Sequence, residues 1–133
     1  MATNILALPQ SLASIETGNN ESWVDSLVYF IGGSEGDSPG PSQLDLRGIE
    51  FEMEIRRRAE DHEVVLRLST DDETLSVGAL PNYGFLLINV PYEIMKAQRA
   101  GDYVADMRAM ADGFTRVIVR ASITIVEGVS KSP

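Results

Sequence analysis

The sequence contains no cysteine, so it has no disulfide bond and no cysteine-based zinc site. This absence is typical of proteins that assemble in a reducing compartment. Basic residues are also few, with 11 Lys and Arg against 20 Asp and Glu, and the formal net charge is −9. Because neutralisation of phosphates by Lys and Arg supplies most of the affinity for nucleic acids, this balance argues against direct nucleic-acid binding.

Long apolar runs are missing as well. No segment approaches the ~18 apolar residues that a transmembrane helix needs, so the sequence predicts no membrane partner. The first residues, MATNILALPQ, have no basic start and match a signal peptide poorly. At 133 residues, the chain is long enough for one domain that buries its own core.

The most regular stretch is LDLRGIEFEMEIRRR, at residues 44–58. Between Ile49 and Arg56, apolar and charged residues alternate without a break. Since successive side chains of a β-strand point to opposite faces, this pattern predicts a strand over 49–57 with one buried face and one wet face. A helix would spread the same apolar residues around its circumference.

The same period of two recurs along the chain, with turn residues between the repeats. The one helical candidate is 91–100, with Pro91 at its start, Ile94 and Met95 inward, and Gly101 as its stop. Segment 32–42, with four Gly and two Pro, is a loop by composition. The expected strands cover residues 12–16, 23–31, 49–57, 64–69, 75–80, 85–90, 103–110 and 114–126.

This spacing of about seven to eight strands predicts an all-β fold, an antiparallel β-sandwich. We expect 1–20 to form an N-terminal arm with the first short strand, 21–130 a single β-sandwich domain, and 131–133 a tail. In the arm, Ile5, Leu6 and Leu8 either belong to a frayed terminus or pack on a neighbouring subunit.

Three strands carry more detailed expectations. Strand 23–31 has no clean polar face, which predicts covering on both sides by its own chain or by a partner. A hairpin between 49–57 and 64–69 places one of the acidic residues of the first strand opposite Arg67. The residues of strand 114–126 that are expected to point inward are Val117, Val119, Ala121, Ile123 and Ile125.

No arrangement of residues predicts catalysis. His62, the single histidine, lies in a charged turn, where a solvated residue is favoured over a base or a metal ligand. Asp71, Asp72 and Glu73 lack the spacing of a calcium-binding loop, and we interpret them as a solvated hairpin tip.

Other polar clusters have similar interpretations. Glu50, Glu52 and Glu54 line one face of a strand. The paired carboxylates of glycosidases flank a bound sugar in a cleft, so we do not interpret these glutamates as such a pair. The Gly-rich segment 32–42 lacks the Lys-Ser/Thr pair of a phosphate-binding loop. Arg56, Arg57 and Arg58 form a basic cluster at a strand end, where such residues protect a sheet edge. The sequence therefore predicts no enzyme, with no catalytic residue, cofactor or metal site.

Several short motifs follow one another in a recognisable order: LDLRGIEFEMEIRR, VVLRLST, LLINVP, AGDYVADMRAM and a closing strand that ends in VEGVS. Within them, Gly101, Tyr103 and Asp106 fit a G-x-Y-x-x-D strand. In this order the chain resembles a group of small phage and prophage virion proteins, in particular the N-terminal immunoglobulin-like domain of siphophage baseplate upper proteins. The resemblance covers residues 23–130, with Ser130 where that group has Thr.

The resemblance implies an immunoglobulin-like sandwich and a structural role in a tailed-phage virion, as a tail, baseplate or head–tail component that acts through protein–protein contacts. It also implies other virion proteins as partners, a homo-oligomer such as a trimer or hexamer, synthesis in the bacterial host cytoplasm, and localisation in the virion. Two alternatives stay open: a capsid decoration or head-fibre protein, and a carbohydrate-binding adhesion module. The candidate glycan-binding aromatics are Trp23, Tyr83, Tyr92 and Tyr103.

Overall fold

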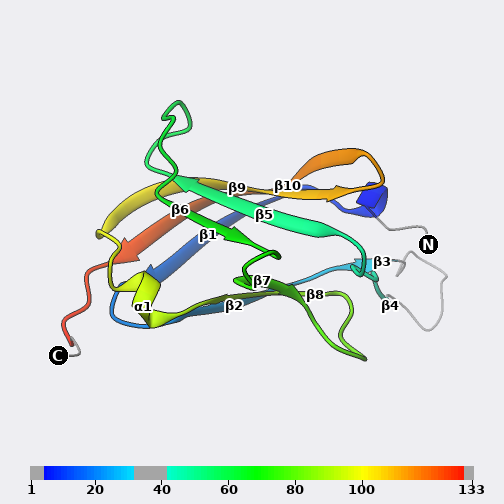
Figure 1. Cartoon of the computed structure of the whole chain (residues 1–133), viewed down its shortest axis with the longest axis horizontal. Coiled ribbons are helices and arrows are strands. Elements are labelled where there is room, and N and C mark those ends of the chain that lie inside the picture. The colour runs from blue at the N-terminus through cyan, green and yellow to red at the C-terminus, as the bar shows by residue number, and fades with distance from the viewer. Residues whose placement is uncertain (1–4, 32–41, 131–133) are drawn as a thin grey trace.

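The computed structural model describes residues 5–31 and 42–130. In these ranges the strands form a five-stranded sheet, a three-stranded sheet and a two-stranded pair. Figure 1 shows the two larger sheets as two layers, with β9, β10 and β5 in the upper layer and β2 and β8 in the lower one. No helix in the described ranges has the length and apolar character to span a membrane.

The large sheet has the order β1-β10-β9-β5-β6, and the small sheet has the order β2-β8-β7. The strands of the large sheet are β1 (Ser11–Gly18), β10 (Phe114–Val126), β9 (Gly101–Ala111), β5 (Glu50–Arg56) and β6 (Leu66–Ser69). Those of the small sheet are β2 (Trp23–Val28), β8 (Phe85–Val90) and β7 (Leu75–Val77). The remaining elements are β3 (Phe30–Ile31), β4 (Ser42–Gln43), the 3-10 helix η1 (Ile5–Ala7) and the helix α1 (Tyr92–Met95).

The prediction of a mainly β chain is confirmed. The prediction of antiparallel pairing is confirmed for every strand pair in the described residues except one. β1 pairs with β10 in parallel, from Ser11 opposite Val119 to Gly18 opposite Val126. A hairpin joins only antiparallel neighbours, and β1 continues into β2 of the other sheet instead of into its own partner. The period of two predicts this strand, but it carries no information on the direction of its neighbour.

The core lies between the inner faces of the two sheets, and β5 contributes its centre. Phe51, Met53 and Ile55 are at most 1% exposed, so the alternation predicted for this strand is confirmed. β5 pairs with β9 on one side and with β6 on the other, which brings core residues from both neighbours beside it. Other core residues from the two sheets are Leu68, Leu75, Leu86, Ile88, Met107, Val119 and Ile123.

The N-terminal segment belongs to this core. Ile5 and Leu8 are each 1% exposed, so neither a frayed terminus nor packing on a neighbouring subunit describes them. The Leu8 N–H donates to the Ile5 carbonyl, which closes a single tight turn. That turn points the side chain of Leu6 outward, where it is 60% exposed.

The predicted strand 23–31 is divided in two. The Tyr29 N–H donates to the Gly84 carbonyl at 2.9 Å, after which β3 leaves the small sheet and pairs with β4. Trp23 is 3% exposed on the inner side, whereas Val24 is 71% and Val28 is 38% exposed on the outer side. The described chain therefore covers one face of β2 and leaves the other open.

Two inward-pointing assignments are wrong. The pairing of β10 with β9 shifts between Val117 and Val119, and this extra residue turns Ile118 and Val119 into the core while Val117 stays half-buried. In α1, Met95 is fully buried but Ile94 is 37% exposed, because one helical turn directs few side chains to the same side.

The ends of several elements differ from those expected. β1 is longer than 12–16, whereas β6 begins two residues after 64 and β7 ends before 80. Leu80 is 74% exposed, and its peptide bond to Pro81 is cis. The Gly-rich segment falls outside the described residues, apart from Ser42 at the start of β4.

Candidate functional site

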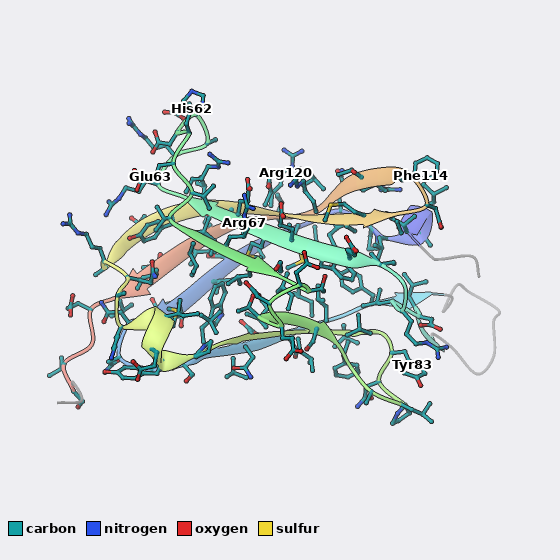
Figure 2. All side chains as sticks on the ribbon, viewed as in Figure 1. His62, Glu63, Arg67, Tyr83, Phe114 and Arg120 are labelled. Carbon is teal, nitrogen blue, oxygen red and sulfur yellow. The ribbon has the colours of Figure 1, made fainter. Side chains whose placement is uncertain are left out.

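His62 and the acidic residues Asp71, Asp72 and Glu73 lie in exposed turns. Figure 2 shows His62 at the tip of the loop between β5 and β6, pointing away from both sheets. The Asp72 carboxylate accepts hydrogen bonds from the Thr74 hydroxyl at 2.6 Å and from the Thr74 N–H at 3.0 Å. Within residues 5–31 and 42–130, no three His, Asp or Glu side chains gather where they could hold a metal ion. Asp72 thus stabilises the turn between β6 and β7.

The outer face of the large sheet carries a ladder of opposite charges. Glu54 lies opposite Arg67, as the hairpin predicts, and contacts it at 2.5 Å. Glu54 also contacts Arg56 at 2.8 Å, and Glu52 pairs with Arg108 of β9. Partly exposed pairs of this kind each contribute about 0.2–1 kcal/mol, so they fix the register of the strands more than they stabilise the fold.

The Glu54 pairs predict a pH dependence. The hydrogen bond from Arg56, together with the nearby charge of Arg67, lowers the pKa of Glu54 below its ordinary value of 4.5. Since the pKa is lower in the folded chain, this stabilisation is present above the unfolded pKa and is lost as pH falls through the folded one. We expect Glu54→Gln to cost about 1 kcal/mol or less at neutral pH and to flatten the loss of stability between about pH 5 and pH 3.

Urea unfolding at a series of pH values measures this effect. Glu50→Gln is the matched control, because Glu50 is exposed on the same face of the same strand. A Glu54→Gln variant whose stability follows the same pH profile as the parent chain would contradict the assignment.

Local contacts account for the arginine cluster. Arg57 lies over the Tyr103 ring, 5.3 Å from its centre. Arg58 approaches Glu60 at 3.8 Å and Asp61 at 3.4 Å. These contacts are all made within the chain, close to the end of β5.

The four aromatic residues proposed for glycan binding do not form one exposed platform. Trp23 is 3% and Tyr103 is 2% exposed, because both point to the inner side of their sheets, and the expectation of exposure is wrong for them. Tyr83 is half-buried in the loop between β7 and β8, where Arg47 lies 3.9 Å from its ring centre. Figure 2 shows Tyr83 at the opposite end of the molecule from His62.

The outer face of the small sheet is the first candidate binding surface. The register places Val24 opposite Asn89, Ser26 opposite Leu87, and Val28 opposite Phe85. A shallow groove of about 920 Å³ runs along this surface, lined in part by Val24, Ser26, Phe85 and Leu87. We call these side chains together with Val28 the β2–β8 face. Val24 and Val28 do not serve the core, so their apolar character is available for contact with another molecule.

A second candidate surface lies on the outer face of the large sheet, beside its edge strand β1. Leu12 is 85% exposed and lies opposite Arg120 in the register of β1 with β10. Both residues line a groove of about 420 Å³, together with Arg56, Val104 and Asp106. Figure 2 shows the Arg120 side chain pointing away from the sheet. This surface mixes both charges, unlike the β2–β8 face.

No protein-family model matches this chain, and no curated protein matches its sequence. The chain's own surfaces and the order of its motifs therefore carry the functional inference. Both surfaces are shallow and open, a shape that suits contact with another macromolecule better than enclosure of a small ligand.

Sequence reasoning did not identify Leu12 or Val24 as surface residues. The signal for Val24 was present, since both sides of strand 23–31 are rich in apolar residues. Which side is exposed depends on the position of the large sheet, and the period of two does not contain that information. For Leu12, exposure follows from its place on an edge strand, which is a property of the assembled sheet.

Proposed function

We propose that this chain is a structural protein of a tailed-phage virion, a tail, baseplate or head–tail component that acts through protein–protein contacts. The observation that carries the proposal is the β2–β8 face, an apolar strand surface with Val24 71% exposed. Contiguous apolar patches on a folded domain mark sites of association. The order of the sequence motifs supports the virion as the place of that association.

We also propose that the sandwich is immunoglobulin-like. If β1, β2, β5, β6, β7, β8, β9 and β10 are labelled A, B, C, C′, D, E, F and G, the large sheet reads A-G-F-C-C′ and the small sheet reads B-E-D. The G-F-C-C′ and B-E-D sets match those of a variable-type immunoglobulin sandwich and support the proposal, whereas the first strand lies beside G and not beside B.

A second feature supports the immunoglobulin-like assignment. Tyr103 lies near the start of β9, directly after the corner that contains α1, and its hydroxyl donates to the Arg99 carbonyl at 2.6 Å. Immunoglobulin domains have a tyrosine at this corner whose hydroxyl bonds to the backbone a few residues upstream. Tyr103 is 2% exposed, so its ring packs in the core while its hydroxyl holds the corner.

Mass spectrometry of purified particles tests the proposed function. Particles of the phage or prophage that encodes the chain are separated into heads and tails, and each fraction is quantified against its major structural protein. We expect the chain in the tail fraction at a fixed stoichiometry. Enrichment in heads would instead favour a capsid decoration or head-fibre protein, and absence from washed particles would refute a virion role.

We further propose that the chain is a homo-oligomer, a trimer or a hexamer. The edge strand β1 supports this, because only β10 pairs with it in the described sheet and it exposes Leu12. An open edge that carries an exposed apolar side chain is a ready surface for self-association. Sedimentation velocity on the purified chain should give the mass of one of these assemblies, and a monomer at all accessible concentrations would exclude both.

A further inference from the structure

Basic residues are absent from the stretches that build the small sheet. No Lys or Arg occurs before Arg47, and none occurs between Arg67 and Lys96. β2, β7 and β8 all lie within these two stretches. Asp25 and Glu73 lie there too, and both border the groove of the β2–β8 face. Asp25 lies opposite Ile88 in the strand register, on the same side of β2 as Trp23, so it borders the face from the edge of the sheet, whereas Glu73 borders it from the turn before β7. Acidic residues therefore flank this face, and its centre is apolar.

The large sheet has a different charge balance. Arg56, Arg67 and Arg108 lie on its strands β5, β6 and β9, and each contacts a glutamate of β5. The arginines of the described sheets thus belong to the opposite side of the sandwich from the β2–β8 face. The two outer faces of one small domain consequently present different electrostatic surfaces to their surroundings.

We infer that the β2–β8 face binds a protein whose contact surface has apolar side chains at its centre and Lys or Arg at its rim. This inference rests on the proposed function and adds the chemistry of the partner. Burial of Val24 and Leu87 would supply the apolar contact, and charges facing Asp25 and Glu73 would select and orient the partner.

A second copy of the chain does not meet this requirement. Pairing of two β2–β8 faces about a twofold axis would bring the acidic rims of two molecules together, each with a net charge of −9. Like charges that meet at an interface oppose association. On the outer face of the large sheet, Arg56, Arg67 and Arg108 are already engaged by glutamates, and Arg120 lies opposite Asp106 in the pairing of β10 with β9. The occupant is therefore a different virion protein.

Photocrosslinking in assembled particles tests this inference. The photoreactive residue p-benzoylphenylalanine is placed at Val24, particles are irradiated, and the crosslinked peptide is sequenced by mass spectrometry. The expected product joins Val24 to a segment of another virion protein in which Lys or Arg flanks apolar residues. A crosslink to a second copy, a crosslink to an acidic segment, or no crosslink would each overturn the inference.

A charge reversal gives a second readout. The double variant Asp25→Lys, Glu73→Lys is expected to enter particles about tenfold less than the parent, a change of ~1.4 kcal/mol. The matched control is Glu60→Lys, Glu63→Lys, which makes the same change of charge in the exposed loop between β5 and β6. Equal incorporation of both variants overturns the inference, and thermal unfolding checks that each is folded. The parent chain is quantified in the same particles. Absence of the parent chain would refute the virion role itself, and not only the inference about the partner.

Discussion

Phe51→Ala is expected to lower the free energy of unfolding by about 3–5 kcal/mol, as removal of a buried aromatic from a packed core does. Phe51 is 1% exposed and lies in β5, between the neighbouring strands β9 and β6 of the large sheet. Domains of this size are stable by only ~5–15 kcal/mol, so the variant loses a large share of the total.

Urea unfolding followed by the fluorescence of Trp23, the single tryptophan, measures this loss, because Trp23 is buried in the same core. The matched control is Phe114→Ala at the start of β10, where the ring is 48% exposed. We expect the control to change stability by less than about 1 kcal/mol. Similar losses for the two variants would mean that Phe51 is not at the centre of the core.

Asn19→Ala is expected to cost about 2–4 kcal/mol, because buried backbone groups lose their partners. The Asn19 side-chain N–H donates to the Gln98 carbonyl at 3.0 Å, and the side-chain oxygen accepts from the Gly128 N–H at 2.9 Å. Asn19 is 9% exposed, so water cannot readily replace these bonds. One side chain thereby joins the turn after β1 to the segment after α1 and to the segment that follows β10.

The neighbouring residue provides the control for this variant. The Asn20 side chain donates to the Ser130 carbonyl at 2.9 Å in an exposed position. Asn20→Ala should therefore cost less than about 1 kcal/mol, since water can take the place of the lost group. Thermal unfolding of the two variants compares the stability that each one loses. An equal loss for both would show that burial of the Asn19 hydrogen bonds contributes nothing.

The alternating strands were the most predictable part of the fold. β5, β9 and β10 carry a clear period of two, and the contact between Glu54 and Arg67 follows from a simple hairpin. A period of two is a local property, since it depends only on the opposite directions of successive side chains.

Features that depend on distant parts of the chain were not predictable in this way. The parallel pairing of β1 with β10 joins residues that are more than a hundred positions apart, as the bond from the Ser11 hydroxyl to the Ile118 carbonyl shows. The shift between Val117 and Val119 changes which residues face inward without leaving any mark on the alternating pattern. In the sequence Ile5 and Leu8 look like part of a loose arm, because their burial depends on core residues that are distant along the chain.

The difference between local patterns and contacts of distant segments also applies to the candidate surfaces. The sequence identifies the apolar residues of strand 23–31, but the small sheet and its packing decide that Val24 faces outward while Trp23 faces the core. In contrast, the absence of Lys and Arg around β2, β7 and β8 is visible in the sequence as soon as the three strands are known to be neighbours.

The parallel pairing of β1 and β10 has a mechanical consequence. In Figure 1 the two strands run in the same direction along the long axis of the domain. Tension applied to the chain before β1 and after β10 pulls the two strands past each other lengthwise. All the hydrogen bonds between them then share the load in shear, whereas a hairpin pulled from its open end would break one bond at a time. Such a domain is expected to resist stretching between its two ends more than a hairpin of the same length would.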